Sequence, residues 1–338
     1  MGKNIEMNML RERGKALPEV TDEMYLKCNK NNRQLVDDFF EENPLLSPAT
    51  KKQYWSALRQ FLWFVHEKLN DKNWEDITKR EFNKYMNLLI NNGMSSSGIK
   101  FKRSAVSTVC EYIIDILAED DEEKYATFRN FTKGKLKIAK NQVYDKVPIT
   151  EEEYHLIIDT LLEREMYMEV AWVACAFASG ARRGGLRQFK SDIVNQTIKE
   201  GQKFFKTNIV REKGSSKDGK QVDYLLPIDV MQYIKLWLDK RGYEHEYIFT
   251  VKYHGEIKQI SLGWANGFCT DTLSEILGRR VNPHLFKGSA ITNYLSKGFS
   301  LKFVSQTIAK HNDTSTTINH YDLRGNEDEA NDEFGKLM

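Results

Sequence analysis

Three short stretches of the sequence bring arginine, lysine, histidine and tyrosine close together, and these residue types suit the chemistry of a phosphodiester. They are ASGARRGGLRQFKSDI, PHLFKGSAITNYLSKG and TIAKHNDTSTTINHY, at residues 178–193, 283–298 and 307–321. Cationic side chains and imidazoles that converge on one point can bind a phosphate and neutralise charge on its oxygens. A tyrosine hydroxyl beside them could attack the phosphorus and hold it covalently. The sequence therefore predicts a phosphodiester-binding site.

The elements that must position these residues begin with helices in the first part of the chain. Ser47 followed by Pro48 predicts the N-cap and first turn of a long helix, after which apolar residues recur at three- and four-residue steps. Thr78 and Glu81 have the spacing of a capping box and predict a second helix. A third helical pattern runs from about residue 98 to residue 117. We therefore expect residues 31–140 to form an all-helical domain.

The second part of the chain combines helices with short strands. A basic stretch at residues 133–146 precedes Pro148, which disfavours helix at the residue before it. Thr150 and Glu153 repeat the capping-box spacing and open a new apolar helix. Between about residues 203 and 228, two β-like runs flank the turn-rich KGSSKDGK. The predicted parts are an arm (1–30), a helical domain (31–140), a linker (141–148), a mainly helical domain with a small antiparallel sheet (149–325) and an acidic tail (326–338).

Composition permits two domains and disfavours several classes of protein. With 338 residues, 41% of them hydrophobic, the chain is long enough for two cores. The 50 basic and 48 acidic residues nearly cancel, so only local clusters of charge can indicate a nucleic-acid partner. The four cysteines lack paired spacing, which disfavours a metal site or disulfides and predicts buried thiols in a reducing cytosol. No apolar run approaches a membrane span, and the N-terminal segment is too charged for a signal peptide.

In this order and at this spacing, the three basic stretches resemble those of the tyrosine recombinase (phage integrase) family. LSPATKKQYWSALRQFLWFV and ITKREFNKYMNLLINNGMSSSGIKFKRSAVSTV resemble its DNA-clamping core-binding domain, and PITEEEYHLII resembles the start of its catalytic domain. The likeness runs from about residue 30 to residue 321. It implies a mainly α fold, with an N-terminal helical, SAM-like domain and a C-terminal catalytic-type domain that is helical with a small antiparallel β-sheet.

The resemblance also implies roles for individual residues. Arg182 occupies the position of the family's first catalytic arginine, which grips the scissile phosphate. Lys213 stands where the family has the lysine that protonates the leaving 5′ oxygen. His284 matches the first residue of the H-x-x-R box, and His311 matches the second histidine. Tyr321 is the nearest candidate nucleophile.

The catalytic set departs from the family pattern at several positions. Lys287 replaces the second arginine, and a lysine offers a point charge in place of a planar fork that holds two phosphate oxygens. Gly185 replaces an acidic residue that usually follows the first arginine. Gly288 and Ser289 replace a His-Thr pair. These changes predict a weakened or lost strand-cleavage activity, because losing one transition-state donor costs about a hundredfold or more in rate.

The tyrosine is out of register by one residue. Nine positions after His311, where the family has its nucleophile, this sequence has His320, and Tyr321 follows. One residue along a helix is a rotation of about 100°. We therefore expect the side chain of Tyr321 to point away from the site unless the preceding loop absorbs the shift.

A further set of basic residues is expected to contact DNA phosphates, because it lies in the presumed DNA-clamping domain, in the basic stretch after it, or beside the first arginine. The alternative is a solvated charged surface. The set comprises Lys51, Lys52, Arg59, Lys100, Lys102, Arg103, Lys133, Lys135, Lys137, Lys140 and Arg183.

The leading hypothesis is a sequence-specific DNA-binding protein that has lost strand cleavage and acts as a transcriptional repressor of a phage or mobile element. The alternative is an active integrase that forms a 3′-phosphotyrosyl intermediate. A third hypothesis is a helical protein-interaction module without a role on DNA. For the first two, the partner is double-stranded DNA, no metal or other cofactor is expected, and the protein would be cytoplasmic and associated with a bacterial nucleoid. The C-terminal segment, with Phe334, Leu337 and Met338, either docks on a neighbouring subunit to form a homo-oligomer or frays.

Overall fold

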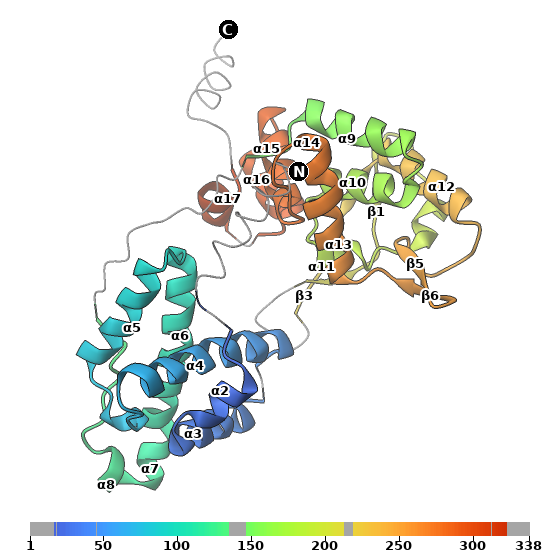
Figure 1. The fold of residues 1–338 in the computed structure, drawn as a ribbon. Coiled ribbons are helices and arrows are strands. Elements are labelled where there is room, and N and C mark those ends of the chain that lie inside the picture. Colours follow the sequence, from blue (N-terminus) through green and yellow to red (C-terminus); the bar gives the residue numbers. More distant parts are fainter. Residues whose placement is uncertain are drawn as a thin grey trace. The chain divides into compact units, whose positions relative to one another are not determined.

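The computed structural model of the chain consists of two compact units, Met1–Asp145 and Lys146–Met338. Each has a hydrophobic core of its own, and each is described here by itself (Figure 1). The structure describes residues 17, 19–44, 46–134, 147–212, 219–311 and 313–322.

The elements among the described residues of the first unit are all helices. Its elements are α2 (Asp22–Lys27), α3 (Lys30–Glu42), α4 (Pro48–Lys68), the 3-10 helix η1 (Trp74–Asp76), α5 (Lys79–Asn91), α6 (Ser96–Tyr112), the π-helix η2 (Ile113–Leu117), α7 (Ala118–Asp120) and α8 (Glu122–Tyr125).

Side-chain caps start the helices of the first unit where the sequence predicts them. The Ser47 hydroxyl accepts a hydrogen bond from the backbone N–H of Thr50 at 3.1 Å, with Pro48 in the first turn of α4. Thr78 and Glu81 form both bonds of the predicted capping box at the start of α5. A cluster of aromatic rings, with Phe61 and Trp74 fully buried, fills the space between these helices. The all-helical character predicted for this part of the chain is confirmed.

The ordered part of the first unit begins earlier than predicted. Residues 22–27, which we assigned to the N-terminal arm, form α2, and the Thr21 side chain caps it. Tyr25 is 7% exposed and joins the core, where its ring lies 5.4 Å from that of Trp55. The aromatic ring anchors a helix of only 6 residues, which is too short for a periodicity argument to detect.

The second unit surrounds one apolar helix with other helices and short strands. Its helices are α9 (Glu151–Glu163), α10 (Tyr167–Ser179), α11 (Arg183–Leu186), the 3-10 helix η3 (Ser191–Asn195), α12 (Val230–Arg241), α13 (Leu262–Phe268), the π-helix η4 (Cys269–Leu273), α14 (Ser274–Leu277), α15 (Leu285–Ser296), α16 (Leu301–Phe303), the π-helix η5 (Val304–Ile308) and α17 (Thr314–His320). The strands are β1 (Phe204–Lys206), β2 (Val210–Glu212), β3 (Lys220–Val222), β4 (Leu225–Pro227), β5 (Thr250–Tyr253) and β6 (Glu256–Gln259).

Helix α10 is the centre of the second core. Its sequence is apolar on every side, and α9, α12 and α15 pack around it (Figure 1). Such a helix is stable only when it is enclosed, because each of its faces gains free energy from burial. Cys175 on α10 and Cys269 on η4 are buried free thiols, as are Cys28 and Cys110 in the first unit. The prediction that the cysteines are buried is confirmed.

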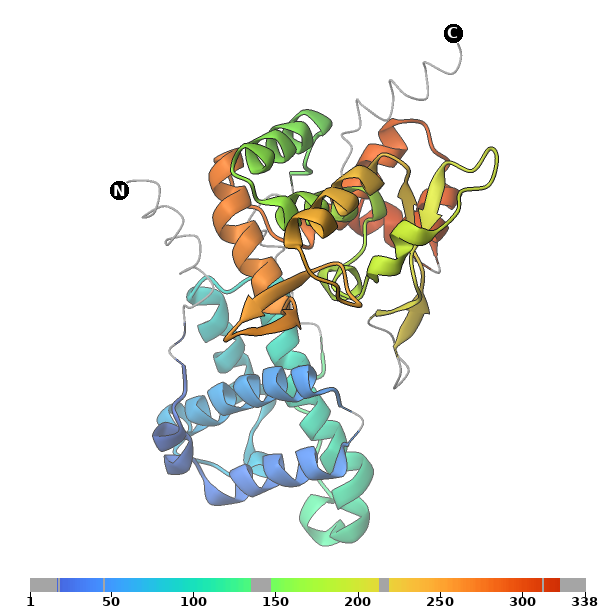
Figure 2. The ribbon, with the colours of Figure 1, turned by 90° about the vertical axis from the view of Figure 1, so that its right-hand side faces the viewer.

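The strands form antiparallel pairs. Strand β1 pairs with β4 and β2 with β3, so the two β-like runs of the sequence make one interrupted hairpin. Strands β5 and β6 make a separate hairpin, drawn in orange in Figure 2. The described residues thus contain three short ladders where we expected one small sheet. No helix among the described residues has the length and apolar character needed to cross a membrane.

Candidate active site

The first arginine of the site lies in a tight turn at the end of α10. Gly180 closes the helix with φ +62°, a conformation that disfavours residues with a Cβ. A Cβ at this position would also lie 3.3 Å from the Cβ of Ala290 on α15. The turn therefore runs close against α15, and Arg182 follows it as the N-cap residue of α11.

Arg182 is held by a buried carboxylate. Its Nη1 donates to Oε2 of Glu212 at 3.0 Å, and the Glu212 side chain is only 4% exposed. The other carboxylate oxygen accepts a hydrogen bond from the Tyr224 hydroxyl at 3.0 Å. Burial disfavours the charged guanidinium, but the hydrogen bond and charge of Glu212, helped by Tyr321, more than offset it and raise the pKa of Arg182. With 36% of its side chain exposed, the arginine keeps one side available to a ligand.

An open pocket lies beside this arginine. It has a volume of about 400 Å³ and is lined by Arg182, Arg183, Asn266, Asn282, Pro283 and His284. The Nη1 of Arg183 donates to the side-chain oxygen of Asn266, which directs that arginine along the wall. Two guanidinium groups and an imidazole around one hollow suit a phosphate.

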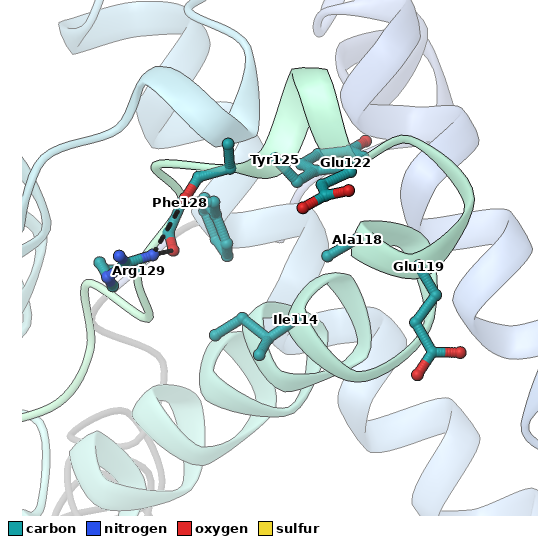
Figure 3. A pocket seen from close by; sticks show the side chains of 8 residues that line it. Ile114, Ala118, Glu119, Glu122, Tyr125, Phe128 and Arg129 are labelled. Carbon is teal, nitrogen blue, oxygen red and sulfur yellow. Dashed lines mark hydrogen bonds between the residues drawn. The ribbon is translucent and has the colours of Figure 1, made fainter.

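A larger pocket in the first unit has a different character. It measures about 510 Å³ and lies where the end of η2 and α7 meet α8, with Glu119 and Glu122 among its lining residues (Figure 3). Its one arginine, Arg129, donates to the backbone carbonyls of Ala126 and Phe128. Carboxylates repel a phosphate, so the pocket in the second unit is the better candidate for a phosphodiester.

Lys287, which replaces the second arginine, is buried. Its side chain is 1% exposed, and its Nζ donates to the carbonyl oxygen of Ala309 at 2.6 Å. Burial, together with the positive charge of Arg182, lowers the pKa of Lys287 to about 7. The expectation that this lysine offers a point charge to a phosphate therefore does not match its position, because the ammonium is used inside the protein.

Two lysines hold the segment that leads to the second histidine. Lys287 on α15 donates a hydrogen bond to the carbonyl of Ala309, and Lys220 on β3 donates one to the carbonyl of Lys310 at 2.7 Å. The backbone N–H of His311 then donates to the carbonyl of Ser305 at 2.9 Å. These bonds position His311 from two separate elements.

The ring of His311 is also oriented by hydroxyl groups. Its Nδ1 lies 2.8 Å from the Thr317 hydroxyl, which donates to the Ser305 hydroxyl at 2.9 Å. Both Thr317 and Ser305 are fully buried. The chain of hydrogen bonds fixes the direction of the imidazole relative to η5 and α17.

Tyr321 lies in the site, so the expectation that it points away is wrong. Its hydroxyl is 3.4 Å from Nε2 of His284, and its ring centroid is 4.8 Å from that of His311. The Nζ of Lys287 lies 5.3 Å from the same ring centroid. The expectation assumed that the helix continues through residue 321. In the structure α17 ends at His320 and Tyr321 is its C-cap, with φ −132° and ψ −17°, so the helical rotation does not apply.

The other residues predicted for the site differ in what the structure says of them. Lys213 lies outside the described residues, as do Lys135, Lys137 and Lys140. Residues 326–338, which carry the predicted tail, also lie outside them. Arg182 and His284 line one pocket. Tyr321 lies beside His284, His311 and the buried Lys287.

The basic residues predicted to contact DNA in the first unit fall into two groups. Lys52, Lys100 and Lys133 are exposed, although Lys133 pairs with Glu111 at 2.9 Å. The remainder are partly buried and engaged inside the unit: Lys51 with the carbonyl of Phe40, Arg59 with Asp22, Lys102 with Gln60, and Arg103 with the carbonyls of Thr132 and Gly134. The second group stabilises the fold, which leaves less side chain for a phosphate.

The sequence reasoning did not identify four residues of the site. Glu212, Tyr224, Thr317 and Ser305 bind its cationic groups or orient them. One signal was present: Gly185 leaves the first arginine without the expected carboxylate, so another acidic residue had to be sought. The hydroxyl residues gave no comparable signal, because serine and threonine are common on every helix surface.

Sequence profiles of known families match both units. The profile described as the phage integrase family matches residues 147–326, and that of the phage integrase N-terminal SAM-like domain matches residues 36–119. A SAM-like helical domain followed by this catalytic-type domain defines a tyrosine recombinase fold. The chain belongs to the phage integrase family. The SPbeta prophage-derived recombinase-like protein YomM of Bacillus subtilis (strain 168) is 47% identical over 335 residues, which cover 99% of this chain and all of that protein.

Solved structures show the same fold at low sequence identity. The Tn1549 transposon integrase in complex with transposon right end DNA matches with a TM-score of 0.66 at 14% identity, covering 91% of this chain and 99% of that one. XerH recombinase bound to palindromic difH substrate matches with a TM-score of 0.64 at 16% identity, covering 96% and 94%. A lambda integrase dimer bound to a COC′ core site matches with a TM-score of 0.61 at 20% identity, covering 89% and 79%.

Proposed function

We propose that the chain binds duplex DNA sequence-specifically and that its second unit cleaves and rejoins a DNA strand through Tyr321. One observation carries the proposal: the Tyr321 hydroxyl lies 3.4 Å from Nε2 of His284, a residue that lines the same pocket as Arg182. The Tn1549, XerH and lambda proteins named above were each solved bound to DNA, which supports duplex DNA as the ligand.

The chemical step follows from this arrangement. The phenol oxygen of Tyr321 attacks the phosphorus, a bond from phosphorus to that oxygen forms, and the bond to the 5′ oxygen breaks. The phenol proton passes to an imidazole, for which Nε2 of His284 is in place. The leaving 5′ oxygen takes a proton from Lys213, the role that the resemblance gives it. Attack by a 5′ hydroxyl reverses the step, so no high-energy cofactor is needed.

The charge that develops on the phosphate is met by Arg182 and His311. Lys287 is buried and donates to a backbone carbonyl, so it does not supply the second pair of hydrogen bonds that an arginine would. Loss of one such donor lowers a rate by about a hundredfold or more. We therefore expect the chain to recombine DNA slowly.

A second function is favoured by the same burial of Lys287. A phosphate bound by Arg182 and His284 without the second guanidinium could be held and not cleaved. The protein would then act as a repressor of a phage or mobile element, recognising an operator with its two units. On this hypothesis Tyr321→Phe leaves operator affinity unchanged, whereas Arg182→Ala and Lys213→Ala weaken it through lost phosphate contacts.

The deciding experiment is a suicide-substrate assay with the full chain. Binding sites are first selected from a random duplex library, and a nick is then placed so that the short fragment released by cleavage cannot religate. Wild-type protein should form a covalent adduct on denaturing gels, and Tyr321→Phe should lose it. Tyr253→Phe, at an exposed tyrosine of β5, is the matched control and should retain the adduct.

Each other outcome has a defined meaning. Tight, salt-sensitive binding without any adduct would reject cleavage and favour the repressor. Absence of DNA binding, or binding without steep salt dependence, would reject both and favour a protein-interaction module. Assembly through residues 326–338 and association with the nucleoid stay predictions; sedimentation of protein–DNA complexes with and without those residues tests the first.

A further inference from the structure

We infer that Glu212 is a positioning residue for Arg182, and that it has replaced, from a different element, the acidic residue that the family carries three positions after its first arginine. The inference rests on the proposed function, because it assigns Arg182 to the phosphate. It explains why a glycine at residue 185 is compatible with an intact arginine site.

Both oxygens of Glu212 are used. One accepts from Arg182 Nη1 at 3.0 Å, and the other accepts from the Tyr224 hydroxyl at 3.0 Å. The Glu212 side chain is 4% exposed, whereas that of Arg182 is 36% exposed. A carboxylate so enclosed has one orientation, so one edge of the guanidinium is fixed and the remainder faces the pocket.

Gly185 provides the space for this carboxylate. A Cβ at residue 185 would lie 2.5 Å from Oε1 of Glu212 and 3.6 Å from the Tyr224 ring. A separation below 3.0 Å cannot be kept, so the neighbour would have to move. That neighbour is buried and bonded on both oxygens, which leaves it no free direction.

The glycine is required for space and not for its backbone conformation. Gly185 lies inside α11, and its φ is not in the positive range that favours glycine. The adjacent Gly184 provides an internal comparison, since a Cβ there would meet nothing within 4 Å. The close approach at Gly185 is thus specific to the residue that faces Glu212.

An acidic side chain at residue 185 and the glutamate at residue 212 are therefore mutually exclusive. The 2.5 Å between the built Cβ and Oε1 is about the reach of a carboxylate oxygen from the Cβ of an aspartate. An aspartate at 185 would place its oxygen where Glu212 now has one. In this chain the carboxylate beside Arg182 comes from β2, and the position on α11 where the family has its acidic residue is a glycine.

The position of this carboxylate at the end of β2 matters for function. Glu212 is the last residue of β2, and Lys213 follows it directly in the sequence. One strand end thus fixes the arginine and precedes the lysine assigned to the leaving oxygen.

A double-mutant cycle in the full chain tests the inference. Glu212→Ala and Gly185→Asp should each slow adduct formation at saturating DNA by on the order of tenfold to a hundredfold, because the arginine loses its fixed geometry. The combination of Gly185→Asp with Glu212→Ala should recover the rate to within a few-fold of wild type. Gly184→Asp, the matched control, should stay close to the wild-type rate.

The readouts separate positioning from stability. The rate at saturating DNA is compared with the dissociation constant, and thermal unfolding of each variant is followed by circular dichroism. Losses that add in the double variant would overturn the inference. Recovery of thermal stability without recovery of the rate would also overturn it, because Glu212 would then be only structural.

Failure of the proposed function would look different. If wild-type protein forms no adduct, the same four variants are compared by DNA affinity, in which Arg182 still contacts a phosphate. Reciprocal rescue of affinity would support the role of Glu212 although cleavage is absent, and additive losses of affinity would reject it.

Discussion

Replacing Lys287 by methionine should make the second unit more stable at pH 6 and flatten the dependence of its stability on pH. The lysine is 1% exposed, and burial lowers its pKa from 10.5 to about 7. Methionine has a similar length and no charge, so it fits the space without the cost of burying an ammonium.

The magnitude follows from the two pKa values. Below pH 7 the amine is charged in both the folded and the unfolded state, and the folded state bears the full cost, roughly 5 kcal/mol. Between pH 7 and about 10.5 the folded state binds fewer protons than the unfolded state, so wild-type stability rises with pH. By pH 9 the cost has fallen to roughly 2 kcal/mol.

Methionine also removes the donor to the carbonyl of Ala309. An unpaired buried carbonyl costs about 1–3 kcal/mol, and this cost does not depend on pH. The expected net effect of Lys287→Met is therefore a gain of roughly 2–4 kcal/mol at pH 6 that declines to about zero at pH 9.

The assay is urea unfolding of the full chain from pH 6 to pH 9. Because the two units need not unfold together, the transition is followed by hydrogen-exchange mass spectrometry on peptides from α10 and α15. Lys302→Met is the control: that lysine is exposed, so its ammonium stays hydrated in both states. The free energy of unfolding of Lys302→Met should change with pH in the same way as that of the wild-type protein.

Two results would refute the reasoning. If wild type and Lys287→Met showed the same pH dependence, the amine would not be a buried, destabilised cation. If Lys287→Met were less stable than wild type at pH 6, the bond to the Ala309 carbonyl would outweigh the cost of burying the charge.

Three further predictions concern a cap, a hydrogen-bond chain and the DNA interface. Thr150→Ala should lower the stability of the second unit by about 1 kcal/mol, because it removes half of the capping box of α9. Thermal unfolding measures this loss, and an unchanged midpoint would show that the cap is unimportant. Thr317→Val should slow adduct formation at least about tenfold with little change in affinity, because the His311 ring loses its link through Thr317 to the Ser305 hydroxyl. Thr316→Val is its control, and equal effects of both would contradict the argument. DNA affinity should fall at least about tenfold between 50 and 200 mM salt if several phosphates are contacted, and a flat titration would contradict a phosphate interface.

Local signals predicted the helices well because their physical causes are local. A cap such as Thr78 with Glu81 satisfies backbone groups within one turn, so the few residues involved are enough to recognise it. The helix predicted from about residue 98 to 117 is present, but its last turn widens into a π-helix at Ile113–Leu117. Neither that change nor the anchoring of α2 by Tyr25 can be recognised from the neighbouring sequence, because both depend on packing against residues far away in the chain.

The site was only partly predictable for the same reason. The resemblance assigned Arg182, His284 and His311 to one site. In the structure Arg182 and His284 line one pocket, and the His311 ring lies beside Tyr321, which approaches His284. The direction of Tyr321 depends on where α17 ends, which is set by packing and not by its own turn. Glu212 lies 30 residues from its partner in sequence, and only the tertiary structure brings the two together.

The π-helical turn η5 at Val304–Ile308 contains one residue more than a regular turn would hold. Deletion of one residue there would let the segment close as ordinary α-helix and would disturb little of the apolar packing. Because the wide turn already absorbs the extra residue, the chain that follows would keep nearly the same direction, and the second histidine would stay close to Tyr321. A wide turn of this kind therefore lets the chain gain or lose one residue without moving the groups beyond it, and a genetic deletion of three nucleotides at this place should be tolerated.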